Sequence, residues 1–417
     1  KVTKIESTTT YNTAGNQTLY AHWLSSPIIK GGTSEVWSGS SIEILLDTPS
    51  KSDTSDTIKY QYYLSTSQTE QVGGTWIDVT SVDGGVAIYE NGKHYIFYRA
   101  INVNRDISSV SNYNTLLIDS VTPSVTLSAY HRGNGQKIES DQWTNAGLRF
   151  EFGDLTAGPS GATIYYCISD STSCIPSKVA SPNQAVTDSA LDNKTGVYKF
   201  IYQVSSNAGV DSKIFTFIAK VDTTAPTMKG VITSLKDSST LTTLTNSSTS
   251  YDDSSWKNYG YKITLSGTDS LSGISKITKY TNANNLKKTD SNYKSNLVSG
   301  DITSTKTHSE SADGAKYAKF VATDKAGNTT TFTVEVLIDT VAPNPVIKLY
   351  KANSDEKKTG SVLKTIDTSV NTAINSWTNY RHYFDLSSST DSLSGIKEMK
   401  MQINDYGIFA TGNTAAG

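Results

Sequence analysis

Three aspartates at corresponding positions could bind a metal ion. Asp119, Asp222 and Asp339 each open the phrase Asp-x-x-x-Pro, directly after a hydrophobic segment that reads as a strand. Hard cations such as calcium need several oxygen ligands from carboxylates, backbone carbonyls and water. If the phrases mark junctions between domains, loops of two domains meet at each aspartate. The sequence therefore indicates calcium as an optional ligand at these junctions, and no other cofactor is required.

A second interpretation of the same aspartates stays open. An aspartate side chain can accept hydrogen bonds from the backbone of its own turn, and it then needs no metal. The chain has no dense Asp-x-Asp-x-Asp cluster, which is typical of a dedicated calcium loop. Capped turns and calcium sites are thus both compatible with the three phrases.

The two cysteines favour a disulfide. Cys167 and Cys174 follow the strand-like run Ile164-Tyr165-Tyr166, so we expect them to face each other across a hairpin loop. An oxidised pair is typical of an extracellular protein. Two sulfur ligands without a nearby histidine do not make a tetrahedral zinc site. The alternative to a Cys167–Cys174 bridge is a pair of free thiols.

Catalytic motifs are missing from the sequence, and we expect no enzyme. The chain contains neither a nucleophile elbow nor a glycine-rich phosphate loop. Its five histidines are scattered along the chain, at positions His22, His94, His131, His308 and His382. Serine, histidine and aspartate are all present, but abundance alone does not make a catalytic triad.

The elements that position these residues repeat along the chain. Besides Asp-x-x-x-Pro, the phrase Trp-x-Asn occurs at Trp143, Trp256 and Trp377, and both phrases recur after roughly 100 to 120 residues. Because these tryptophans recur at one position in each repeat, we interpret them as packing residues. The prolines at the junctions fix φ and favour extended neighbours. Consecutive domains should therefore stack end to end, as a rod on the order of 150 Å long.

Within each repeat the hydrophobic pattern predicts strands only. Side chains alternate after each Trp-x-Asn phrase, which indicates half-buried strands. The alternating positions are Leu148, Phe150 and Phe152, then Tyr261, Ile263 and Leu265, and finally His382, Phe384 and Leu386. About seven short strands in about 100 residues are typical of an immunoglobulin-like β-sandwich. The predicted fold class is all-β, with tandem sandwiches in an elongated array.

Several motifs resemble those of a known family. The turns Asp269-Ser270-Leu271-Ser272-Gly273-Ile274 and Asp391 to Ile396, the segment Asp324 to Asn328, and the Asp222 and Asp339 junctions resemble bacterial immunoglobulin-like (Big-type) repeats of large surface proteins. The resemblance covers residues 24 to 417. The first repeat departs from it, with Asn102 to Asp106 in place of the glycine turn. Some related repeats bind calcium at the junction, so the resemblance makes calcium a candidate ligand here, beside the capped turn without a metal.

The first 23 residues resemble a different module. The run from Ser7 to Trp23, which ends in Leu-Tyr-Ala-His-Trp, is similar to the closing half of a Listeria-Bacteroides repeat, a β-grasp-like module. The predicted domains are thus 1–23, the end of this module; 24–121, 122–224 and 225–341, three complete immunoglobulin-like repeats; and 342–417, a truncated fourth repeat. Both ends of the chain read as cut, which predicts further domains in a longer protein.

The composition of the chain excludes some classes of binding partner. Charged residues make up only 18% of the chain and the net charge is −2. The sequence therefore lacks the excess of positive charge that would attract nucleic acids. No apolar run is long enough to span a bilayer. Tyrosine is abundant, with 24 copies against 10 phenylalanines. One ring of Tyr62-Tyr63 or of Tyr165-Tyr166 could stack on a sugar, although core packing is the simpler interpretation.

These features predict a structural role outside the cell. We expect a segment of a bacterial cell-surface or cell-wall protein that projects a distal binding domain as a stalk or adhesin, with a surface glycan or protein as partner. One alternative is the accessory, glycan-binding region of a secreted enzyme that acts on polysaccharide. A second alternative is a subunit of a self-assembling surface layer or filament.

Overall fold

The computed structural model describes residues 24–25, 27–30, 35–47, 57–69, 74–80, 85–102, 110, 113–170, 173–284, 286–369, 378–402 and 408–412. The predicted β-grasp module of residues 1–23, Trp377 and most of the Asn102 to Asp106 turn lie outside these residues. The described chain consists of β-strands and one 3-10 turn, η1 (Ser189–Leu191), and contains no α-helix. It forms two compact units. One comprises residues 1–142 and 147–220, and the other comprises residues 143–146 and 221–417.

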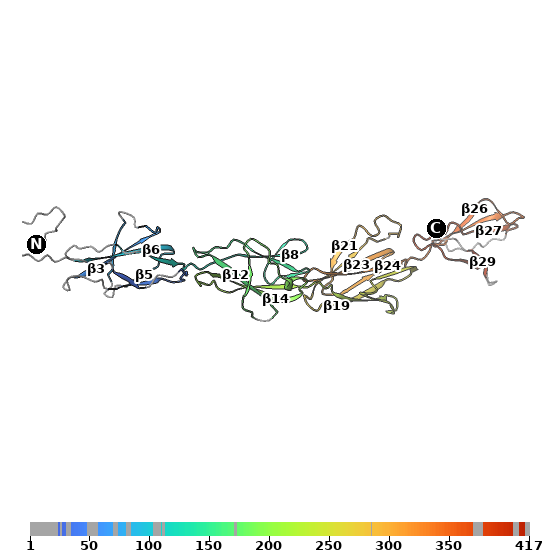
Figure 1. Ribbon diagram of the computed structural model, residues 1–417. Coiled ribbons are helices and arrows are strands. Elements are labelled where there is room, and N and C mark those ends of the chain that lie inside the picture. The colour runs from blue at the N-terminus through green and yellow to red at the C-terminus, as the bar shows by residue number, and fades with distance from the viewer. Residues whose placement is uncertain are drawn as a thin grey trace, which may run out of the picture. The chain divides into compact units, whose positions relative to one another are not determined.

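The first unit begins with a sandwich of two antiparallel sheets (Figure 1). One sheet has the order β1 (Ile28–Lys30), β2 (Ile42–Asp47), β5 (Gly85–Ile88). The other has the order β4 (Ile77–Asp78), β3 (Ile58–Ser65), β6 (Gly92–Asn102), β7 (Asn114–Ile118). The core lies between the sheets, because Ile44 and Ile88 of the first contact Ile96 and Leu116 of the second.

A second sandwich follows in the same unit. Its smaller sheet has the order β11 (Leu148–Phe152), β8 (Leu127–His131), β9 (Lys137–Ile138). Its larger sheet contains β15 (Phe215–Val221), β14 (Gly196–Ser206), β12 (Ala162–Ser169) and β13 (Lys178–Ala180) in that order. Phe150 of β11 stacks on Phe200 of β14 with ring centres 4.2 Å apart, so aromatic rings join the two layers.

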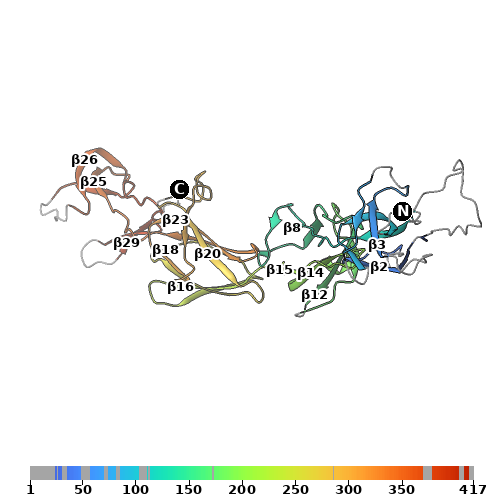
Figure 2. The ribbon, with the colours of Figure 1, turned by 90° about the vertical axis from the view of Figure 1, so that its left-hand side faces the viewer.

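The second unit contains β10 (Trp143–Thr144) and a larger sandwich (Figure 2). One sheet has the order β17 (Thr240–Thr245), β16 (Thr227–Ser234), β19 (Tyr261–Thr268), β22 (Thr307–Glu310). The other has the order β18 (Ser250–Lys257), β24 (Thr329–Ile338), β23 (Gly314–Asp324), β20 (Ile274–Thr281), β21 (Val298–Asp301). Ile232 and Ile263 of one layer pack with Phe320 and Phe332 of the other.

The last strands of the unit form two smaller sheets. One has the order β26 (Lys358–Ile366), β25 (Ile347–Ala352), β27 (Arg381–Asp385), and the other pairs β28 (Met399–Gln402) with β29 (Ile408–Gly412). The strands of each of the three sandwiches, and those of the last two sheets, fall within one of the four predicted segments from residue 24 onward. The domain boundaries themselves stay predictions.

The strand predictions are confirmed where the structure describes them. β11 and β19 alternate buried and partly or fully exposed side chains, with Phe150 and Ile263 at 0% exposure. The third predicted strand is shorter than the pattern indicated, since β27 ends at Asp385 and leaves Leu386 in the following turn. The all-β, immunoglobulin-like fold class is therefore correct.

Candidate functional site

The three junction aspartates are buried at the ends of strands. Asp119 follows β7, Asp222 follows β15 and Asp339 follows β24, and their exposed fractions are only 0, 0 and 8%. Each backbone N–H donates to a carbonyl oxygen of a neighbouring segment at 2.8 to 2.9 Å. The acceptors are Ser38 for Asp119, Thr144 for Asp222 and Lys257 for Asp339.

Their side chains make the same two contacts at all three junctions. Oδ1 accepts from the N–H two residues later, at 2.9 to 3.1 Å, in Val121, Thr224 and Val341. Oδ2 accepts at 3.0 Å from the N–H of a serine 41, 50 or 55 residues away, namely Ser160, Ser272 or Ser394. We call these three contacts, one through the backbone and two through the carboxylate, the junction clamp.

A tight turn presents each serine to its aspartate. The serine is followed by a glycine with φ of 78°, 76° or 74°, in Gly161, Gly273 and Gly395. This left-handed conformation suits glycine, because other residues incur a steric penalty there. The Ser-Gly dipeptide therefore aims the serine N–H at the carboxylate, and the three junctions share one geometry.

The clamp keeps the buried carboxylates ionised. Burial by itself raises the pKa of Asp222, but the N–H groups of Thr224 and Ser272 bind the charged form and leave the pKa below its ordinary value. The same balance lowers the pKa of Asp119 and of Asp339, where Ser160 and Ser394 provide the largest opposing contribution.

At one junction two further carboxylates join the clamp. Asp222, Asp269 and Asp324 each place a carboxylate oxygen within 4.8 Å of the others. Asp269 opens the Ser-Gly turn and accepts from the N–H of Gly273 at 2.7 Å. Asp324 ends β23 and accepts from the N–H of Asn328 at 2.8 Å. We call Asp222, Asp269 and Asp324 the acidic cluster.

The amide of Asn328 is the donor that bridges this cluster. Its Nδ2 donates to the backbone carbonyl of Asp222 and to Oδ2 of Asp324, both at 2.7 Å. Asp324 is 2% exposed. Three carboxylates so close together repel one another, and a bound cation or a shared proton would relieve this repulsion. The donor set of hard oxygens fits calcium or a similar cation.

The residues at the corresponding positions differ in the other two junctions. In the first, the positions of Asp269 and Asp324 are taken by Ala157 and Ser206, and Ser160 adds its hydroxyl to the contact with Asp119. In the third, Asp391 stands where the second has Asp269, and it accepts from the N–H of Gly395 at 2.9 Å. Among the residues that the structure describes, three carboxylates converge at Asp222 and not at Asp119.

The sequence reasoning did not identify the partners of the junction aspartates. Asp269, Asp324 and Asp391 were interpreted as turn residues, although an aspartate at the start of two adjacent turn motifs could have revealed a cluster. The repeated tryptophan has a further counterpart at Trp37, which the sequence analysis did not identify. Trp37 directly precedes Ser38, whose carbonyl accepts from Asp119, just as Trp143 directly precedes Thr144, whose carbonyl accepts from Asp222. Trp256 packs partly against Leu337, in line with a packing role.

The structure joins Cys167 and Cys174 in a disulfide. The Cα atoms are 6.3 Å apart, and the bond connects β12 to the loop that follows it. Cys167 is 8% exposed, so the bridge lies against the second sandwich.

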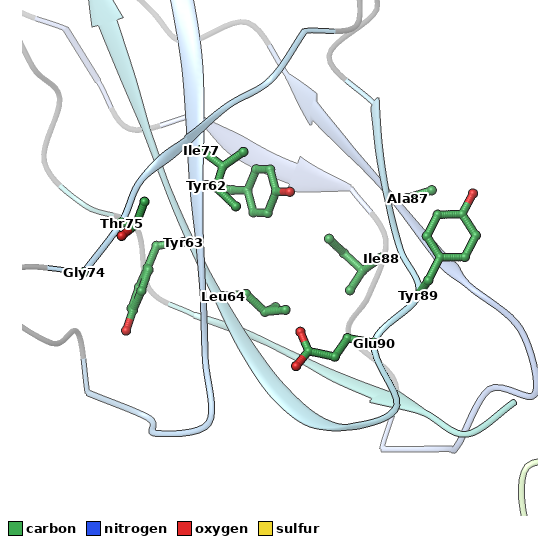
Figure 3. A pocket seen from close by; sticks show the side chains of 10 residues that line it. All are labelled: Tyr62, Tyr63, Leu64, Gly74, Thr75, Ile77, Ala87, Ile88, Tyr89 and Glu90. Carbon is green, nitrogen blue, oxygen red and sulfur yellow. The ribbon is translucent and has the colours of Figure 1, made fainter. Parts of the chain in front are cut away.

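A surface pocket of about 620 Å³ lies in the first sandwich, between β3 and β4 of one sheet and β5 of the other. Figure 3 shows Tyr62 beside Ile77, with Tyr89 on the far side of the pocket. Tyr89 is 71% exposed, whereas Tyr62 is half-buried and packs against the core. Of the other predicted pair, Tyr165 is half-buried and Tyr166 is buried. An exposed ring is thus found next to the first tyrosine pair, at a residue that the sequence did not single out.

The junction clamp predicts an acid-sensitive contribution to stability at Asp119. Because its pKa is lowered on folding, the contribution is present above the unfolded-state pKa of about 3.9 and is lost as the pH falls through the lower folded value. We expect Asp119→Asn to reduce the free energy of unfolding by about 1.5 to 3 kcal/mol at pH 6, and by less below pH 4. Urea unfolding across this pH range measures the effect.

The matched control is Asp154→Asn, which changes an exposed aspartate of the same unit. It should leave the stability within about 0.5 kcal/mol of the unmodified chain. An equal loss in both variants, or a loss at Asp119 that does not depend on pH, would contradict the clamp.

Comparisons with known structures give weak likenesses. A bacterial ice-binding adhesin of 1.5 MDa is 13% identical, with a TM-score of 0.30 and coverage of 78% of this chain and 100% of that one. A Ca2+-stabilized adhesin from an Antarctic bacterium is 13% identical, with a TM-score of 0.27 and coverage of 81% and 79%. A tetra-tandem repeat from the extending region of a large adhesion protein is 13% identical, with a TM-score of 0.26 and coverage of 79% and 85%. Scores this low support no conclusion about the present chain.

Comparison of the sequence with protein families identifies one segment of the chain. No curated protein matches the chain significantly. In the part of the chain that the structure describes, no helix is long and apolar enough to cross a membrane. The segment that holds the third sandwich, residues 225–340, matches the model of a family described as a bacterial Ig-like domain.

Proposed function

We propose that the chain is a non-catalytic, structural segment of a bacterial surface protein, which extends a distal binding domain from the cell as a stalk or adhesin. The observation that carries this proposal is the junction clamp, which recurs with one geometry at Asp119, Asp222 and Asp339. A repeated, buried connection suits domains that are joined in series, whereas a catalytic site does not require one. The bacterial Ig-like match at residues 225–340 and the disulfide support an extracellular location.

A stalk should be extended in solution. We expect small-angle scattering of the monomer to give a maximum dimension on the order of 150 Å, from the length of sandwiches in series. A compact globule of this chain length would instead have a radius of gyration of about 22 Å. A measured radius of gyration of about 22 Å would contradict the stalk proposal.

We further propose that the acidic cluster binds calcium, and that the Asp119 junction does not. Asp222 and Asp324 are buried, and the three carboxylates converge within 4.8 Å. Asp119 has the clamp and the Ser160 hydroxyl, with Ala157 and Ser206 at the positions of Asp269 and Asp324. Asp391 stands at the position of Asp269 beside Asp339. In this proposal calcium stiffens selected junctions and the hydrogen bonds alone hold the others.

Calorimetry with calcium and with chelator tests this proposal. Saturating calcium should raise the melting temperature of the unmodified chain by several degrees, because a ligand at 100 times its Kd contributes about 2.7 kcal/mol. The double variant Asp269→Asn with Asp324→Asn should lose most of the shift. Asp119→Asn is the control and should keep it.

The response to calcium separates the two interpretations. If no cation binds, calcium should leave the melting temperature of the unmodified chain unchanged. That result, or a calcium shift of equal size in the double variant, would contradict the calcium proposal.

A second candidate function is glycan binding at the surface pocket of the first sandwich. The specific observation is the exposed Tyr89 ring beside a concave surface lined by Tyr62, Tyr63 and the carboxylate of Glu90. Concave sites with aromatic walls and a few polar groups are typical of ligand binding. The pocket would give the surface protein, or a secreted enzyme that contains it, affinity for polysaccharide.

Affinity electrophoresis in gels containing soluble host, plant or bacterial polysaccharides tests the pocket. At least one polysaccharide should retard the unmodified chain, and Tyr89→Ala should weaken binding at least about tenfold, as expected for an aromatic hot spot. Tyr113→Ala changes another exposed ring outside the pocket and should have no effect. Retardation by none of the polysaccharides, or an equal effect of both substitutions, would rule the pocket out.

A further inference from the structure

A lysine side chain is buried in the third sandwich without a close ion pair. Lys316 lies on β23 and is 1% exposed, and it is one of the largest fully buried side chains of the described chain. Its Nζ is 3.8 Å from Oε1 of Glu310, a long separation for an ion pair. Its close contact is instead Oδ1 of Asn284, at 2.6 Å. An ammonium group in this position has little compensation for its lost hydration.

The surroundings of Lys316 lower the pKa of its ammonium group. Burial is the main cause, and the carboxylates of Glu310 and Asp313 oppose it only in part. A neutral lysine amine is a nucleophile, whereas the ammonium form is not. The burial of Lys316 therefore shifts its proton equilibrium toward the nucleophilic form, and its hydrogen bond places the amine against the Asn284 amide.

The loop after β20 holds the Asn284 amide against this amine. Asn282, two residues earlier, accepts at Oδ1 from the N–H of Tyr317 at 2.9 Å and donates from Nδ2 to the carbonyl of Ala315 at 3.0 Å. These contacts flank Lys316 on both sides. Further along the loop, the hydroxyl of Tyr293 donates to the carbonyl of Lys316 at 3.3 Å. Hydrogen bonds of Asn282 and Tyr293, one before and one after Asn284 in the chain, thus connect this segment to β23.

Glu310 places a carboxylate beside the Lys316 amine, at 3.8 Å from Nζ. It ends β22, opposite Tyr261 of β19, and its side chain is 16% exposed. Its Oε1 accepts from the N–H groups of Ser311 and Ala312 at 3.1 and 3.0 Å, which fixes the carboxylate beside Lys316. Amine, amide and carboxylate are the three groups that transamidation requires.

We propose that Lys316 and Asn284 form an intramolecular isopeptide bond, with Glu310 as the proton-transfer group. Nζ of Lys316 attacks Cγ of Asn284, and a new N–C bond forms. Glu310 takes the proton released by Nζ and delivers a proton to Nδ2. The Cγ–Nδ2 bond then breaks and ammonia leaves, so that the product is a secondary amide. No oxidant, metal or other reactant is consumed.

The crosslink would tie the loop after β20 to β23 of the same sandwich. It would add a covalent connection to the hydrogen bonds that Asn282 and Tyr293 already make there. This inference depends neither on the calcium proposal nor on the surface role of the chain.

Mass spectrometry of the intact, folded chain tests the bond. After correction for the two hydrogens lost in the Cys167–Cys174 disulfide, the measured mass should be lower than the sequence mass by one ammonia molecule. A proteolytic digest should contain one branched peptide that joins the segments around Asn284 and Lys316. An intact mass equal to the sequence mass would overturn the proposal.

Substitutions distinguish the crosslink from other reactions that release ammonia. Lys316→Arg and Asn284→Ala should restore the full mass, and Asn284 is exposed enough for its substitution to be tolerated. Glu310→Gln should restore most of it. Lys319→Arg, on the same strand, is the matched control and should keep the deficit. An asparagine that cyclises onto its own backbone also loses ammonia, so a deficit that persists in both Lys316→Arg and Asn284→Ala would contradict the crosslink.

Discussion

The buried carboxylate at each junction is the interaction on which the arrangement of the surrounding loops depends. A charge with almost no exposure is stable only when hydrogen-bond donors replace its water. Asp119, Asp222 and Asp339 obtain these donors from their own turn and from a serine of a Ser-Gly turn more than 40 residues away. The charge therefore orders two segments at once, and the backbone N–H of the aspartate adds a third by donating to its carbonyl. Removing the carboxylate would leave the N–H groups of the two segments without their common acceptor.

Around this common clamp, the three junctions differ in charge. The first adds the Ser160 hydroxyl and remains a hydrogen-bonded turn. The second adds Asp269 and Asp324, which brings like charges together and creates the condition for a cation. Since the clamp itself is the same in all three, the added residues change the ligand chemistry and leave the geometry intact. Under the calcium proposal, one structural device gives junctions of different stiffness and different response to calcium.

Much of the fold follows from local sequence patterns. Alternation of side chains predicted β11 and β19, because each strand has one face on the core, and the phrase Asp-x-x-x-Pro singled out the three buried aspartates. The spatial partners of these residues were not predictable in the same way. Ser160, Ser272 and Ser394 are far from their aspartates in sequence, and a Ser-Gly dipeptide in a serine-rich chain carries little information alone.

Other functional residues depend on contacts that no short motif encodes. Lys316 occupies a position in β23 that alternation does not distinguish from that of a surface lysine, and Asn284 lies in a loop without a repeated pattern. Their encounter results from the pairing of β20 with β23 and from the staple made by Asn282. The acidic cluster similarly requires two turns, at Asp269 and Asp324, to converge on one junction. Topology, rather than composition, brings these groups together.

Native-state hydrogen exchange at the serine amides tests the central claim most directly. If the junction carboxylates hold the Ser-Gly turns, the N–H groups of Ser160, Ser272 and Ser394 should be protected in the folded chain, although they lie in turns. Asp119→Ala should abolish the protection of Ser160 and leave that of Ser272 and Ser394 unchanged. Fast exchange of all three amides in the unmodified chain, at the rate of exposed turns, would contradict the account.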